Sequence, residues 1–372
     1  MSEYMGKDTF KLGFGLMRLP KNADGSINHE EVSEMADRFI AAGGTYFDTA
    51  YVYDGGKSEE AFRKCVAERY PRDAYTICTK LCAWMHCHDE ESAKQQFWTS
   101  LERCGAGYFD YYLLHALQRN NYTKYDEYHI WDFIQVQKEK GLVKHWGFSF
   151  HADPELLEEL LNAHPEVDFV QLQINYADWD NPGVASRECL EICQRHNKPV
   201  TVMEPIKGGK LASPSADVRE IFDAYDANRS YASWAIRFVA SQDYIITVLS
   251  GMSNLAQMED NLSYMKDFKP LNDEEDRVIK RVQAVLSKDQ SIKCTACHYC
   301  TDGCPMSIPI PEIFSASNKA RQGNKTEAQK DYDTAVEERG RASDCIQCGQ
   351  CEGACPQHLP IITYLEQARD FD

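Results

Sequence analysis

Eight cysteines near the end of the chain have a spacing that suits iron–sulfur chemistry. They form two runs with the pattern CxxCxxCxxxCP, which are Cys294, Cys297, Cys300 and Cys304, then Cys345, Cys348, Cys351 and Cys355. A 4Fe-4S cluster needs four thiolates around one small object, and two-residue gaps let one tight loop supply three of them. The two runs therefore predict two 4Fe-4S clusters.

The last cysteine of each run precedes a proline, and such a cysteine usually ligates the other cluster. On that rule, one cluster takes Cys355 together with the first three cysteines of the first run. The other cluster takes Cys304 with the first three cysteines of the second run. Structural zinc is the alternative, because CxxC pairs also fit tetrahedral zinc sites. Two complete runs that both end in Cys-Pro favour clusters over zinc.

A second set of chemical side chains lies where short β-type segments end in the first third of the chain. Asp48, Lys80 and His115 each close such a segment, and Tyr53 follows in the loop after Asp48. A phenol beside an ammonium group is easier to ionise, and a buried aspartate would keep the lysine charged. The trio therefore predicts a tyrosine that gives a proton to a carbonyl oxygen, while the histidine orients or polarises the carbonyl.

The elements that must position these side chains alternate along the first 270 residues, with β-type segments between amphipathic helical ones. The alternation predicts parallel strands joined by crossover helices. Eight such strands predict an α/β fold, a (β/α)8 TIM barrel, whose active site lies at the C-terminal strand ends. An open dinucleotide-binding sheet is the alternative, but GFGLMR at 13–18 lacks the third glycine of its motif. The predicted strands are 11–18, 45–50, 75–81, 109–115, 145–150, 168–176, 199–205 and 244–251.

The chain divides into a barrel at 1–270, a linker helix at 271–290 and a two-cluster domain at 291–372. Helical patterns at 310–321 and 325–338 lie between the two cysteine runs. Compact two-cluster ferredoxins use a shorter spacer and short strands, so we expect a mostly helical, ferredoxin-like 4Fe-4S domain at the C-terminus.

Composition narrows the range of partners and the location. The formal net charge of −18 opposes binding to nucleic acid or to anionic membrane surfaces, which both need a basic patch. No apolar run approaches the roughly 20 residues of a membrane-spanning helix, and the N-terminus shows no signal peptide. We therefore expect a cytoplasmic protein. Its other cysteines, spaced irregularly, are expected to be free thiols; they are Cys65, Cys78, Cys82, Cys87, Cys104, Cys189 and Cys193.

Over residues 10–268 the chain resembles the aldo-keto reductase family. That family has a tetrad of Asp, Tyr, Lys and His on these strands, with the tyrosine five residues after the aspartate, as in Asp48 and Tyr53 but not Tyr51. The resemblance implies that Asp48, Tyr53, Lys80 and His115 are catalytic and that the substrate is a small carbonyl or alcohol. The whole chain resembles the subgroup that carries a C-terminal two-cluster 4Fe-4S ferredoxin-type domain.

The same resemblance implies NADP or NAD as cofactor. GFSF at 147–150 and QINY at 173–176 resemble segments whose serine and glutamine, here Ser149 and Gln173, hold the nicotinamide carboxamide. Met203 stands where many relatives stack a tyrosine on the nicotinamide. The loop and helix start at 251–261 resemble the adenosine-phosphate site, yet 251–257 carry no Lys or Arg, so we expect a weak preference for NADPH. The other implied cofactor residues are Gly15, Met17, Gly251, Ser253, Gln257 and Asn261.

Three functions remain open. A nicotinamide passes a hydride and a cluster passes one electron; a flavin normally mediates between them, and the chain shows no flavin motif. The favoured hypothesis is a nicotinamide-dependent carbonyl oxidoreductase whose clusters exchange electrons with a ferredoxin, a flavodoxin or another redox protein. The alternatives are an electron-transfer module that turns over no free carbonyl, and an ordinary reductase with structural clusters.

The loop at 82–88, CAWMHCH, lies just after Lys80 and offers cysteine and histidine ligands for a metal ion. Ligands within one loop need not converge on an ion, and no further ligand pair stands out. We therefore favour a role for Trp84 and Met85 in lining the substrate pocket.

Overall fold

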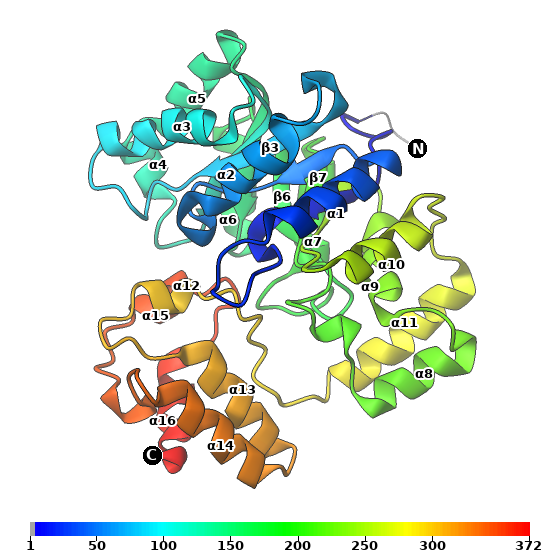
Figure 1. Cartoon of the computed structure of the whole chain (residues 1–372), viewed down its shortest axis with the longest axis vertical. Coiled ribbons are helices and arrows are strands. Elements are labelled where there is room, and N and C mark those ends of the chain that lie inside the picture. Colours follow the sequence, from blue (N-terminus) through cyan, green and yellow to red (C-terminus); the bar gives the residue numbers. More distant parts are fainter. Residues whose placement is uncertain (1–3) are drawn as a thin grey trace.

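The computed structural model describes residues 4–372, and its larger part is a closed barrel of eight parallel strands (Figure 1). The strands pair in chain order, and β8 closes the barrel on β1. This confirms the (β/α)8 TIM barrel and excludes the open sheet. The strands are β1 (Leu12–Gly15), β2 (Tyr46–Asp48), β3 (Thr76–Leu81), β4 (Phe109–Leu117), β5 (Val143–Phe150), β6 (Phe169–Gln173), β7 (Val200–Met203) and β8 (Ile245–Ser250).

Helices surround the barrel and join its strands. The helical segment between β4 and β5 is broken into two helices, because His129 has a φ of 49° and cannot continue an α-helix. Between β7 and β8 the chain forms two helices, α8 and α9. The helices are α1 (His29–Ala41), α2 (Lys57–Phe62), α3 (Glu90–Cys104), α4 (Thr123–Glu127), α5 (Ile130–Glu139), α6 (Pro154–Ala163), α7 (Ser186–Arg195), α8 (Ala216–Asp226), α9 (Tyr231–Ala240), α10 (Leu255–Met265) and α11 (Asp273–Leu286).

Local sequence fixes where several of these helices begin. The Asp153 side chain accepts a hydrogen bond from the Leu156 backbone N–H, and Pro154 occupies the first helical position of α6. At the start of α10, the Asn254 side chain accepts from the Gln257 N–H. The Asn254 cap orients the first turn of α10, and this turn follows the C-terminal end of β8.

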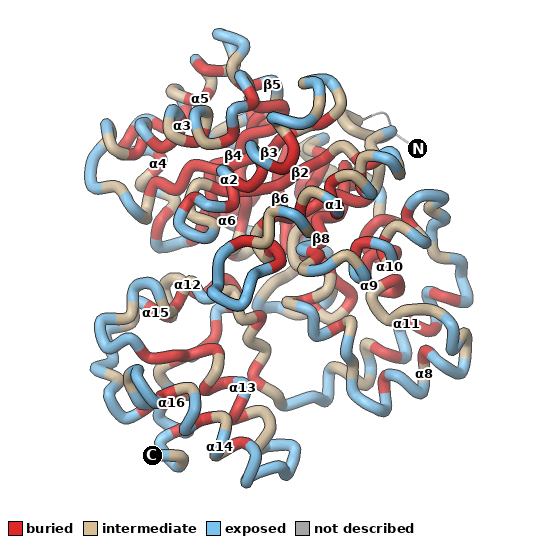
Figure 2. The backbone as a smooth tube through the Cα atoms, viewed as in Figure 1, coloured by how far each residue is buried: buried red, intermediate tan, exposed pale blue. Residues whose placement is uncertain are grey.

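The barrel strands are buried (Figure 2), and an apolar cluster fills the barrel interior below the C-terminal strand ends. Side chains two residues apart in a strand face the same side. Lys80 therefore faces the same side as the buried Cys78, and His115 the same side as the buried Leu113, each two residues closer to the C-terminal end of its strand. The apolar layer leaves polar side chains at the C-terminal strand ends. Its residues are Tyr46, Cys78, Tyr111, Leu113, Phe169, Ile246 and Leu249.

The C-terminal part of the chain is helical, as predicted, and no strand occurs among its described residues 287–372. It has an apolar core of its own, which includes Ile313, Phe314 and Tyr332. Figure 1 shows α12 and α15 on the side that faces the barrel and α14 on the far side. The helices are α12 (Tyr299–Asp302), α13 (Ile310–Arg321), α14 (Lys325–Val336), α15 (Gln350–Ala354) and α16 (Ile361–Ala368).

Helix α11, which connects the two parts, lies against the barrel. The buried Glu275 carboxylate accepts hydrogen bonds from Arg237 of α9 at 2.8 and 3.0 Å. Gln283 Nε2 donates to the backbone oxygen of Tyr176 at 2.9 Å. Of the helices in the described part of the chain, none is long and apolar enough to cross a membrane.

Candidate active site

Two members of the predicted tetrad form a buried ion pair at the C-terminal end of the barrel. Lys80 Nζ donates to Asp48 Oδ1 at 2.5 Å and to the backbone oxygen of Thr49 at 2.6 Å. Gln171 Nε2 donates to the other carboxylate oxygen, Asp48 Oδ2, at 3.2 Å. The ammonium group is fully buried and the carboxylate nearly so. A buried lysine needs such partners to stay charged.

Tyr53 lies next to this pair. Lys80 Nζ is 4.9 Å from the centroid of the Tyr53 ring, and the centroids of the Tyr53 and His115 rings are 5.8 Å apart. The structure therefore brings all four predicted residues together. Burial raises the pKa of Tyr53 well above its ordinary value, the charge of Asp48 adds to this, and a hydrogen bond with Tyr299 opposes it. The sequence-based expectation of a more easily ionised tyrosine is wrong for this state, because burial outweighs the lysine. A neutral phenol still has a proton to give.

His115 lies near the C-terminal end of β4 and lines the same cavity. Burial lowers the pKa of His115 well below its ordinary value, and the charges of Lys80 and His151 act in the same direction. The imidazole is therefore neutral near pH 7. Its Nε2 lies 3.3 Å from the hydroxyl oxygen of Tyr299. A neutral imidazole can orient a carbonyl oxygen through one hydrogen bond at this atom.

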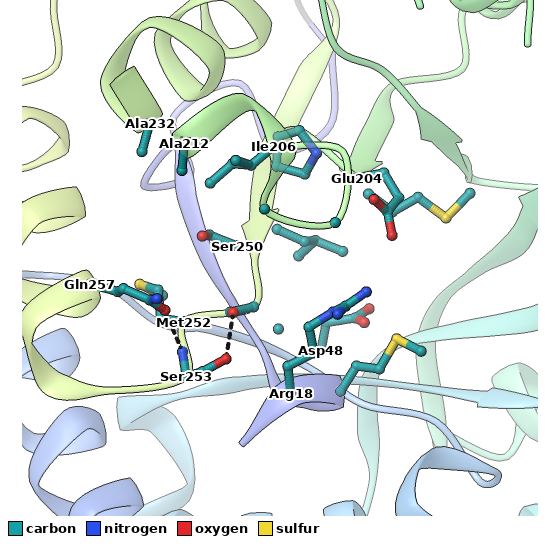
Figure 3. A pocket seen from close by; sticks show the side chains of 18 of the residues that line it. Arg18, Asp48, Glu204, Ile206, Ala212, Ala232, Ser250, Met252, Ser253 and Gln257 are labelled. Carbon is teal, nitrogen blue, oxygen red and sulfur yellow. Dashed lines mark hydrogen bonds between the residues drawn. The ribbon is translucent and has the colours of Figure 1, made fainter. Parts of the chain in front are cut away.

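These residues line a cavity of about 720 Å³ that extends from the tetrad to the start of α10 (Figure 3). Figure 3 shows Ser253 and Gln257 on one side of it and Asp48 and Glu204 on the other. The volume is in the range of sites for cofactors and small ligands. Besides Asp48, Tyr53 and His115, the lining includes these predicted cofactor residues: Gly15, Met17, Gln173, Met203, Gly251, Ser253, Gln257 and Asn261.

The two residues expected to hold the carboxamide have other partners. The Ser149 hydroxyl accepts a hydrogen bond from the Ala116 backbone N–H at 2.7 Å, and Ser149 is absent from the described lining of the cavity. The Gln173 side chain pairs with Gln357 of the C-terminal part: Gln357 Nε2 donates to Gln173 Oε1 at 2.8 Å and Gln173 Nε2 donates to Gln357 Oε1 at 3.3 Å. The carboxamide roles of Ser149 and Gln173 stay predictions.

The far end of the cavity has the character of a phosphate site. The capped start of α10 faces it, and Ser253 N donates to Gln257 Oε1 at 2.7 Å. The first turn of a helix favours negative charge. Asn261 Nδ2 donates to Ser250 Oγ at 2.9 Å, which fixes the amide at the cavity wall.

Arg18 is a cavity residue that the sequence did not single out. It was expected inside a strand at 11–18, but β1 ends at Gly15 and a short 3-10 turn carries Arg18 over the cavity. Its side-chain carbons pack against Gly251, 3.8 Å from where a Cβ would be. The guanidinium Nη2 donates to the backbone oxygen of Thr295 at 2.9 Å. Arg18 therefore links the cavity to the C-terminal part.

The cysteines form two groups that match the crossed ligation pattern. One small cavity is lined by Cys355 and the first three cysteines of the first run, and the other by Cys304 and the first three of the second run. Four converging thiolates per group suit a 4Fe-4S cluster. Nowhere in residues 4–372 do three His, Cys, Asp or Glu side chains form a group that could hold a single metal ion, and this includes the loop at 82–88.

The cysteine-rich part also forms one wall of the active-site cavity. Cys297, Tyr299 and Pro356 line it beside Tyr53 and His115. Trp84 and Met85, expected in the substrate pocket, are not among its described lining residues. Trp84 Nε1 instead donates to the backbone oxygen of His115 at 3.1 Å and supports β4. The loop at 82–88 was expected to line this cavity, but the lining on this side comes from the cysteine-rich C-terminal part.

Crossed ligation predicts which pairs of cysteine substitutions remove one cluster and which remove both. Cys297→Ala combined with Cys355→Ala damages one cluster only and leaves about four of the roughly eight irons per chain. Cys297→Ala combined with Cys304→Ala damages both and leaves almost none. Iron analysis of the anaerobically purified double variants checks this. The reverse result would show that each run serves its own cluster.

A pH dependence of stability follows from His151, which lines the cavity. Burial, together with the nearby His358, lowers the pKa of His151 from 6.5 to about 3. Below about pH 6.5 the unfolded chain therefore binds a proton that the folded chain does not, and stability falls by about 1.4 kcal/mol per pH unit. The free energy of unfolding is measured with urea at about pH 7.5 and at about pH 5.5. Between these two pH values it should fall by about 1 kcal/mol more in the wild type than in His151→Asn. Equal losses would contradict the burial of a neutral His151.

Comparisons with known proteins agree with this architecture. The model of the aldo/keto reductase family matches residues 11–284, and that of a 4Fe-4S dicluster domain matches residues 293–359. The uncharacterized oxidoreductase YqkF of Bacillus subtilis (strain 168) is 21% identical over 312 residues, which cover 76% of this chain and 94% of that protein.

Two solved structures share the fold. The aldo-keto reductase AKR11C1 from Bacillus halodurans, in its holo form, has a TM-score of 0.59 at 21% identity and covers 73% of this chain and 91% of its own. An aldo-keto reductase from Klebsiella pneumoniae in complex with NADPH has a TM-score of 0.59 at 19% identity, over 76% of this chain and 93% of its own. The chain belongs to the aldo/keto reductase family of oxidoreductases and carries a C-terminal 4Fe-4S dicluster domain.

Proposed function

We propose that this protein interconverts a small carbonyl compound and its alcohol with a nicotinamide cofactor and exchanges electrons through its two 4Fe-4S clusters. One observation carries the proposal: Cys297 and Tyr299 line the same cavity as Tyr53 and His115. One predicted ligand of the first cluster, Cys297, therefore lies at the wall of the proposed carbonyl site. The similar Klebsiella pneumoniae enzyme, solved with NADPH, supports the choice of cofactor.

The residues of the site have separate tasks in this proposal. Tyr53 holds the proton that goes to the carbonyl oxygen on reduction, and His115 orients that oxygen through Nε2. Lys80, held by Asp48 at 2.5 Å, stabilises the tyrosinate that Tyr53 leaves behind. When bound, the nicotinamide would supply a hydride and the clusters single electrons. One hydride and one proton complete the reduction. A hydride is a proton with two electrons, and two clusters, when bound, could together hold two electrons.

Cofactor preference follows from the charges at the adenosine end. Residues 251–257 carry no Lys or Arg, and the Arg18 guanidinium is engaged by Thr295. A 2′-phosphate therefore gains little charge pairing, and we expect the Kd values for NADPH and NADH to differ by less than about tenfold. Fluorescence titration of the oxidised protein measures both. An NADPH affinity more than tenfold tighter would contradict this and point to Arg18 turning toward the phosphate.

A second candidate function is an electron-transfer module whose barrel binds a cofactor but reduces no free carbonyl. It is favoured by the partners of Gln173 and Ser149, because the Gln173 amide pairs with Gln357 and the Ser149 hydroxyl accepts from Ala116 N–H. Near the second cluster, Cys348 is exposed and the Ile346 residue is 61% exposed, which would give a ferredoxin, a flavodoxin or another redox protein access. Of the basic side chains in the cluster domain, Lys319 is paired with Asp331 and Arg339 with Glu312.

The test is anaerobic and separates these functions. The purified protein is examined by visible and EPR spectroscopy for clusters and for flavin, and NADPH or NADH is then added. Cluster reduction by the nicotinamide, together with carbonyl turnover, supports the proposal. Cluster reduction without turnover supports the electron-transfer module. Turnover with clusters that neither the nicotinamide nor dithionite reduces would leave them as structural elements.

A further inference from the structure

Tyr299, the first residue of α12, projects from the cluster domain into the tetrad. Its hydroxyl lies 3.3 Å from His115 Nε2, its ring meets the His115 ring edge-on at 6.2 Å, and it shares a hydrogen bond with Tyr53. It is also part of the cavity lining. The Tyr299 hydroxyl is thus a third polar group beside Tyr53 and His115, the two residues assigned to the carbonyl oxygen.

The carbonyl oxygen of a substrate can satisfy only two of these three groups. A carbonyl oxygen has two lone pairs, and Tyr53 and His115 take both. The Tyr299 hydroxyl then loses its place at His115 Nε2 to the substrate. A hydroxyl that loses one of its two partners, His115 and Tyr53, in a confined site is unfavourably placed, so a substrate that brings it a new partner gains affinity.

We propose that Tyr299 is a specificity-determining residue that selects substrates with a second oxygen on the carbon next to the reacting carbonyl. Such substrates are α-hydroxy ketones, α-hydroxy aldehydes and vicinal dicarbonyl compounds. The second oxygen of these compounds is bonded to the carbon next to the carbonyl carbon. In that position the Tyr299 hydroxyl, displaced from His115, can reach it. This inference rests on the proposed function, because it names the substrate class of the same site.

The cluster domain fixes the position of this hydroxyl. Tyr299 stands between Cys297 and Cys300, and the preceding His298 has a φ of 65°, which turns the chain sharply into α12. The domain is held against the barrel by Arg18 and by Lys210, whose Nζ donates to the backbone oxygen of Ile292 at 3.0 Å. Selection by Tyr299 therefore depends on the docked domain.

The close fit of this docking is visible at Gly208, in the loop after β7. A Cβ at this position would lie 2.4 Å from the backbone oxygen of Thr295, and the φ of 64° also favours glycine. The loop and the first cysteine run therefore meet backbone to backbone, which holds the Tyr299 segment at a defined distance from His115.

Hydroxyacetone and butanone form a matched pair of probes, because a hydroxyl in one replaces a methyl group of similar size in the other. Their intrinsic reactivities differ, so the readout is the change in the ratio of their kcat/KM values on substitution. In the holoenzyme, Tyr299→Phe should lower the ratio of hydroxyacetone to butanone by about tenfold. Tyr364→Phe, a cluster-domain tyrosine that packs on Phe314 outside the cavity, should leave the ratio unchanged.

Binding of the same probes separates this inference from the proposed function. Saturation-transfer NMR on the oxidised holoenzyme gives Kd values without turnover, and iron analysis confirms that each variant keeps its clusters. A wild-type preference for hydroxyacetone that Tyr299→Phe abolishes supports the inference, even if neither probe is reduced and the proposed function fails. Equal wild-type affinity for both probes, or a preference that survives in Tyr299→Phe, overturns it.

Discussion

Tyr53→Phe is expected to lower kcat for carbonyl reduction about 10³-fold, with little effect on cluster content or cofactor affinity. Phenylalanine fills the same space but has no proton to give to the carbonyl oxygen. Lys80 Nζ, 4.9 Å from the ring centroid, is another acid beside the ring, but it is already engaged by Asp48 and Thr49. Steady-state kinetics with a small ketone and saturating NADPH measure the effect.

Tyr51→Phe is the matched control, since Tyr51 stands two residues earlier and its ring packs against Arg103 outside the cavity. Its kcat should stay within about twofold of the wild type. A Tyr53→Phe enzyme with more than a tenth of wild-type kcat would place the proton donor elsewhere. Tyr299, the other hydroxyl near His115, would then be examined next.

Lys80→Met is expected to destabilise the protein by about 3 to 5 kcal/mol and to abolish carbonyl turnover. Methionine matches the length of the lysine side chain but leaves the buried Asp48 carboxylate with Gln171 as its remaining side-chain donor. Removing one partner of a buried ion pair leaves an uncompensated charge and strongly lowers the stability. Removing both partners lowers the stability much less. The double variant Lys80→Met with Asp48→Asn should therefore recover most of the stability but none of the activity.

Urea unfolding of these variants measures the effect, with Lys144→Met as control. Lys144 is half exposed, and its partner Asp110 also accepts from Arg72 at 2.7 Å, so its loss should cost less than about 1 kcal/mol. If Lys80→Met were no more destabilising than Lys144→Met, the buried ion pair of Lys80 and Asp48 would contribute little to stability, which would contradict this prediction.

The local sequence determined the parts of this protein whose chemistry depends on short spacings or on regular periodicity. Two-residue gaps between cysteines define clusters because one loop must supply three ligands. Alternating strand and helix patterns predict the barrel, and the barrel in turn places Asp48, Lys80 and His115 at neighbouring strand ends. The resemblance to the aldo-keto reductase family, through the spacing of Tyr53 from Asp48, selected Tyr53 over Tyr51. The other predictions needed only the chain's own local geometry.

The tertiary structure alone decided what closes the active site. Tyr299 and Gln357 each meet their barrel partners, His115 and Gln173, across 184 residues of sequence, and Arg18 reaches Thr295 across 277. No periodicity links such positions, because the contacts depend on how one domain docks on another. Burial likewise reversed the expected direction of the Tyr53 pKa, since desolvation depends on everything packed around the ring. The chemical groups could be identified from the sequence, but which of them line one cavity depends on how the two domains dock.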